Sequence, residues 1–303
     1  MALSIVTPGL WAAARHYTEI QAPVFLQRRL GQAKVQACTF RGGWETRVAE
    51  CLGWQQPQGG QRRWLAWPVA MTPGMTDVVA YELHNVAADE LEQLLSACAE
   101  DFAQAEAQWR WVAPGLLEVE LTAEGLWQGD PPSVGLGHPM VAHEVKTPAM
   151  QRLQVLANAI QMQWFDHAVN AERQRQDQQP IAGLWFWSPG VPTETPRIQR
   201  LAGGGCVAQW LAEAVSIPWD ADPRRSTADC VILEAFVHPP TPERFAEELH
   251  SLVEDILRPR WPTVWGKRAA QTLELHDPGA VRVSWQAWDR FKFWRRASRL
   301  GGF

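Results

Sequence analysis

Two short runs of the chain are almost continuously apolar and lack the alternation of a strand with one face in water. The first is GLWFWS (183–188), which ends at Pro189-Gly190, and the second is ADCVILEAFVH (228–238). Strands of this kind need cover on both faces, which is typical of parallel sheets flanked by helices. We therefore expect strands 183–187 and 229–237 to lie side by side in one sheet of an α/β fold.

Two helical patterns lie beside these strands and offer the cover. Thr147 is placed to cap the first helix, with Pro148 in its first turn, and Thr241-Pro242 starts the second. Each helix has one apolar stripe: Met150, Leu153, Leu156, Ala157, Ile160 and Trp164 within 148–165, and Phe245, Leu249, Leu252, Val253 and Ile256 within 242–257. A hairpin follows, with strands at 271–276 and 280–285.

The earlier part of the chain has a different pattern. Its expected elements are two strands, a helix and a hairpin: 62–70, 78–84, 87–106, 109–112 and 116–122. Residues 123–147 show no steady period and read as a linker. We therefore predict an α+β N-terminal module over residues 1–146 and an α/β module with a mainly parallel sheet over residues 147–303.

The composition fits a folded protein and narrows the function classes. Of 303 residues, 46% are hydrophobic and 20% charged, which argues against disorder over most of the length. The formal net charge of -5 argues mildly against a general nucleic-acid binder. No run of about 18 apolar residues occurs, so we expect no transmembrane helix, and Pro8-Gly9 interrupts the short apolar start, so we expect no signal peptide.

Cysteine and tryptophan usage add two observations. The five cysteines form no CxxC pair, so neither a disulfide framework nor a zinc knuckle is expected, and a reducing, cytoplasmic location fits. The chain has 18 Trp against 2 Tyr. This indicates either a tryptophan-rich core or aromatic platforms for a ligand or partner.

The densest polar cluster lies at the end of the first helix. His167, Asn170 and Arg173 are three residues apart and share one face, beside Asp166. An imidazole, an amide and a guanidinium on one face suit a phosphate or carboxylate, because arginine offers a planar fork of donors. The alternative is a helix end that is tied to the next loop by hydrogen bonds.

Four further patterns are less specific. His138, His143 and Glu144 lack the spacing of a helical zinc site, and Gly203-Gly204-Gly205 lacks the spacing of a phosphate loop and reads as a turn. His238 is followed by two prolines and is expected to end a strand. The tail WQAWDRFKFWRRASRL (285–300) interleaves aromatic and basic residues, which suits either stacked bases or a half-buried edge strand.

One segment carries a family resemblance. DHAVNAERQRQDQQPIAGLWFWSPG (166–190) resembles a motif of RpfE-type bacterial regulatory proteins and archaeal-type cofactor-independent phosphoglycerate mutases, and the preceding helix and the DRFKFWRR tail (289–296) resemble the RpfE-type group. The matching positions are His167, Val169, Asn170, Arg173, Pro180, Trp185, Trp187 and Gly190. Ala168, Asp177, Ala182 and Ser188 stand where the motif has proline, glycine, asparagine and glycine.

The resemblance implies an alkaline-phosphatase-like fold, whose chemistry needs two metal ions, a serine or threonine nucleophile and several Asp and His ligands. An N-terminal Asp-Gly motif normally opens that metal site, and MALSIVTPGL lacks it. Glu234 and His238 have the spacing of one ligand pair, without evident companions. We therefore expect no catalytic residues, no bound metal and no cofactor.

The sequence thus predicts a non-catalytic cytoplasmic regulatory or ligand-sensing protein of RpfE type. Its ligand is expected to be small and phosphorylated or anionic, in a pocket formed by His167, Asn170, Arg173, Trp185 and Trp187. A protein partner of unknown identity fits the same hypothesis. The first alternative is a diverged metal-dependent phosphoglycerate mutase or phosphatase, and the second is a nucleic-acid-associated protein that uses the basic aromatic tail.

Overall fold

The chain folds into two compact units. The computed structural model describes residues 2–37, 43–57, 60–74, 77–83, 85–122, 124–125, 128–140, 147–190, 198–224, 226–236, 241–261, 272–278, 280–286 and 289. Unit 1 comprises Met1–Gly53 together with Glu194–Phe303, and unit 2 comprises Trp54–Thr193. This differs from the expected division at residue 146, because the earliest strand pairs with strands from the last third of the chain.

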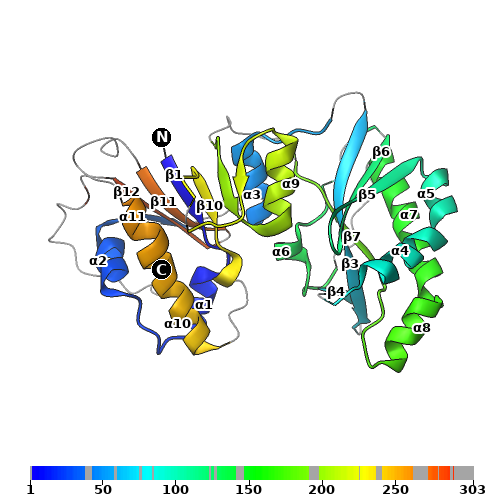
Figure 1. The fold of residues 1–303 in the computed structure, drawn as a ribbon, viewed down its shortest axis with the longest axis horizontal. Coiled ribbons are helices and arrows are strands. Elements are labelled where there is room, and N and C mark those ends of the chain that lie inside the picture. The colour runs from blue at the N-terminus through cyan, green and yellow to red at the C-terminus, as the bar shows by residue number, and fades with distance from the viewer. Residues whose placement is uncertain are drawn as a thin grey trace. The chain divides into compact units, whose positions relative to one another are not determined.

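Unit 1 is built on a seven-stranded sheet in the order β2-β12-β11-β1-β10-β8-β9. Strand β1 lies at its centre and is parallel to both β10 and β11, as Figure 1 shows. The hairpin strand β12 and then β2 extend the sheet in antiparallel fashion. The strands are β1 (Ala2–Val6), β2 (Lys34–Ala37), β8 (Leu201–Gly203), β9 (Trp219–Asp220), β10 (Cys230–Ile232), β11 (Thr272–Asp277) and β12 (Val281–Gln286).

Helices cover both faces of this sheet. On one face, side chains such as Trp11, Leu26 and Phe245 pack with Ile5 and Leu275 of the strands in one apolar cluster. The main helical elements of this cluster are α1 (Leu10–His16), α2 (Val24–Gln32), α10 (Pro242–Ser251) and the π-helical stretch η2 (Leu252–Leu257), and Phe236 adds to it. The opposite face carries α3 (Gly43–Leu52), which packs with α9 (Gly205–Ala214). The short helices η1 (Glu234–Phe236) and α11 (Arg258–Arg260) complete unit 1.

Unit 2 is built on an antiparallel five-stranded sheet. Its strands follow the order β4-β3-β6-β5, and β7 also pairs with β3. They are β3 (Gln61–Pro73), β4 (Val78–Glu82), β5 (Ala107–Ala113), β6 (Leu116–Thr122) and β7 (Gly183–Trp187). One face of the sheet is packed by α4 (Ala88–Ala97), α5 (Ala99–Gln104), α7 (Pro148–Phe165) and α8 (Ala168–Arg175), whereas α6 (Pro132–Gly135) lies beside Trp185. Leu91, Phe102, Leu153 and Trp164 pack against the sheet in a second apolar cluster.

The fold class is confirmed, but one strand pairing is wrong. The molecule combines a parallel-rich sheet packed by helices with a separate antiparallel sheet. Strand 183–187, however, pairs antiparallel with β3 in unit 2, whereas 230–232 lies in the sheet of unit 1. Both faces of β7 are largely buried, so it has the continuous apolar pattern of a parallel strand without being one.

Two helices begin at the threonine caps that the sequence predicts. The Thr147 side chain accepts a hydrogen bond from the backbone N–H of Met150, and Pro148 opens α7. Thr241 caps α10 in the same way through the N–H of Arg244. The helix expected over 87–106 is instead two helices that meet at Cys98, whose φ of -97° and ψ of 13° leave the helical range.

Candidate functional site

The cluster predicted from sequence lies where α7 gives way to α8. His167 is the N-cap of α8, and its Nδ1 accepts a hydrogen bond from the N–H of Val169. Asn170 is 1% exposed. Its amide donates to the carbonyls of Trp164 and Ile181, and its Oδ1 accepts from the N–H of Ile181, so one side chain ties the helix end to the loop before β7.

Arg173 is also 1% exposed, and its guanidinium is hydrogen-bonded to other groups of the protein. It donates to the carbonyls of Gln179 and Asn85 and to the Asn85 side chain. It also forms an ion pair with Glu90 at 2.8 Å. These contacts bind the loop after α8 and the start of α4, which favours the structural alternative for this residue.

The two tryptophans of the predicted pocket belong to the other face of β7. Leu184 and Phe186 pack in the same apolar cluster as Trp164 and Val169. Successive side chains of a strand point to opposite faces, so Trp185 and Trp187 point away from that cluster. Trp185 donates to the carbonyl of Asp130, and Trp187 packs against Trp67 with ring centroids 6.5 Å apart. The structure therefore does not gather the five predicted residues around one pocket.

One departure from the motif has a visible backbone consequence. Asp177 stands where the motif has glycine, and its φ is 55°. Aspartate tolerates the left-handed region better than most residues, because its short polar side chain bonds locally. The turn after α8 is therefore retained without the glycine.

Replacing Asn170 by alanine is expected to reduce the free energy of unfolding by about 1–3 kcal/mol, because two carbonyls and one N–H lose a buried partner. Urea denaturation followed by circular dichroism measures it. Asn158→Ala, at an exposed position of α7, is the matched control and should leave stability nearly unchanged. Equal effects of the two variants would contradict the structural role of Asn170.

Several of the weaker candidates lie outside the described residues. These are His143, Glu144, His238 and most of the basic aromatic tail. His138 is exposed in the segment after α6. Gly203, Gly204 and Gly205 all have positive φ and connect β8 to α9, as a turn requires. Within the described part of the chain, no group of three His, Cys, Asp or Glu side chains is placed to hold a metal ion.

The carboxyl ends of the central parallel strands are where α/β folds usually bind ligands. Here β1 is followed by Thr7, which is fully buried and whose hydroxyl has no hydrogen-bond partner among the described residues. At the end of β11, Asp277 accepts hydrogen bonds from the N–H groups of Gly9 (3.0 Å) and Trp11 (2.8 Å). Burial raises the pKa of Asp277 to about 6, although these two bonds and the nearby Arg15 lower it. The carboxylate thus acts as a cap for α1.

An arginine-lined pocket lies between α2 and α11. It is a surface cavity of about 480 Å³ whose lining residues are Val24, Phe25, Arg28, Arg29, Gln32 and Arg258. The guanidiniums of Arg29 and Arg258 lie 5.4 and 5.0 Å from the ring centroid of Phe25. Arg28 is exposed and makes no hydrogen bond or ion pair within the described residues. Two guanidiniums beside an aromatic ring, with a third in the same lining, suit an anion that also carries an apolar part.

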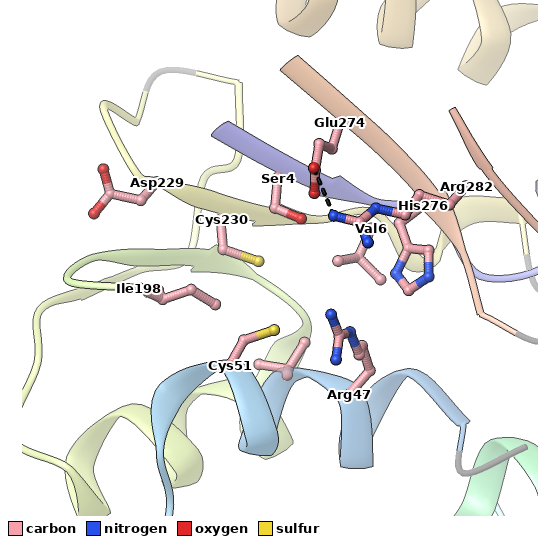
Figure 2. Close-up of a pocket in the computed structure, with 11 residues that line it drawn as sticks. Ser4, Val6, Arg47, Cys51, Ile198, Asp229, Cys230, Glu274, His276 and Arg282 are labelled. Carbon is pink, nitrogen blue, oxygen red and sulfur yellow. Dashed lines mark hydrogen bonds and ion pairs between the residues drawn. The ribbon is translucent and has the colours of Figure 1, made fainter. Parts of the chain in front are cut away.

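A second, smaller cavity lies under α3 on the opposite face of the sheet. It holds about 40 Å³ and is shown in Figure 2. Arg47 and Cys51 reach it from α3, Cys230 from β10 and His276 from β11. Arg282 also lines it and pairs with Glu274 at 2.6 Å. Burial raises the pKa of the Cys230 thiol well above its ordinary value.

Neither cavity was found from the sequence. The residues of the smaller one come from six separate parts of the chain, and no motif links them. The adjacent pair Arg28-Arg29 on a helical segment was the available signal for the larger one, but a pair of basic residues is usually only a solvated helix face.

Comparisons with known proteins give similarity of structure only. No protein-family model matches the sequence, and no curated protein matches it. The cofactor-independent phosphoglycerate mutase from Thermoplasma acidophilum DSM 1728 is 13% identical, with 94% of this chain and 90% of that chain covered and a TM-score of 0.43. The PH0037 protein from Pyrococcus horikoshii is 10% identical, with 93% and 86% covered and a TM-score of 0.47. These similarities assign no activity.

Among the described helices, none combines the length and apolar character needed to cross a membrane.

Proposed function

We propose that this chain is a non-catalytic, ligand-sensing protein that binds a small phosphorylated or anionic molecule in the arginine-lined pocket. The observation that carries the proposal is the pocket itself, where Arg28, Arg29 and Arg258 converge on a cavity of about 480 Å³. This volume lies in the range of small-molecule sites. The regulatory role follows the resemblance of residues 166–190 to RpfE-type proteins.

The charge of the pocket supports an anion as the occupant. Arg258 pairs with Glu254 and Arg29 donates to Gln32, whereas Arg28 makes no hydrogen bond or ion pair within the described residues. The residues that line the pocket include no aspartate or glutamate. A phosphate ester placed there would accept charge-assisted hydrogen bonds, while Phe25 and the exposed Val24 contact its carbon skeleton.

The carboxyl ends of the parallel strands support the absence of catalysis. A phosphotransfer site of the related mutases needs a set of metal-binding carboxylates and histidines at this edge. Asp277 is already committed to the N–H groups of α1, and Thr7 occupies the position that follows β1. The described donors at this edge therefore suit a structural cap better than a two-metal centre.

The melting temperature of the purified chain is expected to rise by about 2–5 °C in millimolar 3-phosphoglycerate or inorganic phosphate at constant ionic strength, because a ligand that binds only the folded state stabilises it. Arg28→Ala should abolish the shift and leave the melting temperature without ligand unchanged. Arg175→Ala, an exposed arginine of α8, is the charge-matched control and should keep the shift. Scanning fluorimetry gives both readings.

Two results would count against the proposal. Absence of any shift in the unmodified chain with these phosphates would remove the anion site. Interconversion of 2- and 3-phosphoglycerate by the purified chain, at a rate that Arg28→Ala does not change, would instead support the diverged mutase.

A further inference from the structure

The smaller cavity of unit 1 brings together two cysteines that are far apart in sequence. Cys51 lies in the last turn of α3 and Cys230 lies in β10, where it pairs with Ser4 of β1. Figure 2 shows the two sulfur atoms pointing toward one another across the cavity. After burial, Cys51 is the largest influence that raises the pKa of Cys230. None of the four described cysteines forms a disulfide in the structure.

The size of the cavity limits what reacts there. A volume of about 40 Å³ holds only a few water-sized molecules, so a metabolite does not fit between the two sulfurs. Hydrogen peroxide is only slightly larger than water and has the same kind of hydrogen-bonding groups. The cavity wall supplies suitable partners for it, because Ser4, Arg47 and His276 all face this space.

The two thiols differ in exposure, and this difference determines which of them reacts first with peroxide. Cys51 is partly exposed, whereas Cys230 is buried. Burial raises the pKa of Cys230, so in the absence of an oxidised Cys51 it remains an inert thiol. Arg47 precedes Cys51 by one turn of α3, so both side chains share the face that lines the cavity. The Arg47 guanidinium, which also pairs with Glu50 at 3.3 Å, would place positive charge near a thiolate and a departing hydroxide.

We propose that Cys51 and Cys230 are a peroxide-responsive thiol pair that forms a reversible disulfide between α3 and β10. The Cys51 thiolate attacks one oxygen of hydrogen peroxide, the O–O bond breaks, and Cys51 becomes a sulfenic acid while hydroxide leaves and is protonated. The sulfur of Cys230 then attacks the sulfenic sulfur. The S–O bond breaks as the S–S bond forms, and the Cys230 proton leaves with that oxygen as water. Two thiols and one peroxide thus give one disulfide and two waters, and a dithiol reverses the reaction.

The bond would fix the point at which the chain leaves unit 1. Cys51 is followed by Leu52 and by Gly53, after which the chain enters unit 2. A disulfide to the central sheet would hold this last turn of α3 against β10. The proposal is independent of the arginine-lined pocket, which lies on the other face of the sheet.

The test uses the full chain with Cys38→Ser and Cys206→Ser, so that Cys98 remains as an internal buried control. Stoichiometric peroxide should remove two of the three thiols, lower the intact mass by about 2 Da and yield a Cys51–Cys230 cross-linked peptide, all reversed by dithiothreitol. Cys98 should stay reduced. Peptide mapping that finds both cysteines still reduced, or oxidised without a cross-link, would overturn the proposal.

Two single variants in the same background test the assigned order. With Cys230→Ser, Cys51 should stop at the sulfenic acid and be trapped by dimedone. With Cys51→Ser, Cys230 should remain unmodified under the same peroxide dose. Oxidation of Cys230 at an unchanged rate without Cys51 would contradict the pair. The mapping of the unsubstituted chain tests the same cross-link if either variant fails to fold.

Discussion

Replacing Arg173 by methionine is expected to lower the free energy of unfolding of unit 2 by about 1–3 kcal/mol, because buried carbonyls lose their donor, although Glu90 is 23% exposed and still accepts from the N–H of Ala87. Glu90 would lose its 2.8 Å partner, and the carbonyls of Gln179 and Asn85 would lose their donors. Methionine retains most of the side-chain length, so the loss reports the polar contacts rather than a cavity. Urea denaturation followed by circular dichroism measures the effect.

The control for Arg173 lies two residues further along the same helix. Arg175 is 72% exposed and pairs with Glu172, also on the surface, so Arg175→Met should change stability by no more than about 0.5 kcal/mol. Arg173→Lys should fall between the two, because it keeps the charge but loses the planar fork. If Arg173→Met costs no more than Arg175→Met, the guanidinium is not a structural tie, and its role as an anion contact becomes the better interpretation.

Unit 1 is expected to lose stability as the pH rises from about 4 to 6, by an amount that depends on one carboxyl group. Folding raises the pKa of Asp277 from 3.8 to about 6, chiefly through burial. The folded state therefore binds this proton more tightly than the unfolded state does. The resulting stabilisation is full below the unfolded pKa and is lost as the pH rises through the folded pKa, which amounts to about 3 kcal/mol.

The difference between the unmodified chain and Asp277→Asn isolates this contribution from other titrating groups. The variant keeps the shape of the side chain but has no proton to lose, so its stability should be flatter across the same pH window. Asp166→Asn, an exposed position at the end of α7, should retain the pH dependence of the unmodified chain. If the free energy of unfolding of all three proteins varies with pH in parallel, Asp277 has the same pKa in the folded and unfolded states, and the prediction is wrong.

Local elements of the fold could be predicted because their signals are local. Thr147-Pro148 and Thr241-Pro242 mark the starts of α7 and α10 through side-chain caps that need only neighbouring residues. The hairpin of β11 and β12 is likewise encoded by its turn. Strand pairing across the chain could not be predicted in this way. The apolar run 183–187 is buried on both faces, and its periodicity cannot distinguish an antiparallel partner from a parallel one.

The residues of the candidate sites were predictable only in part. Asn170 and Arg173 could be predicted as a cluster because they are close in sequence, and the same proximity explains their structural role, since they fix the return of the chain after α8. Arg28 and Arg258 meet only after α2 and α11 have packed on one sheet. Cys51 and Cys230 likewise face one another only through tertiary structure. Such sites depend on contacts between distant segments, which periodicity and spacing do not report.

The central position of β1 has a consequence for how the protein is made. Ser4 pairs with Cys230 and Ala2 pairs with Thr272, so the ribosome must synthesise most of the chain before this strand finds either neighbour. Unit 2 is contiguous and can complete its sheet on the nascent chain first. During that interval the apolar residues of β1 lack their sheet, and nascent chains in this state are prone to aggregation and are typical substrates of chaperones. Slow closure of unit 1 after release is therefore the expected last step of folding.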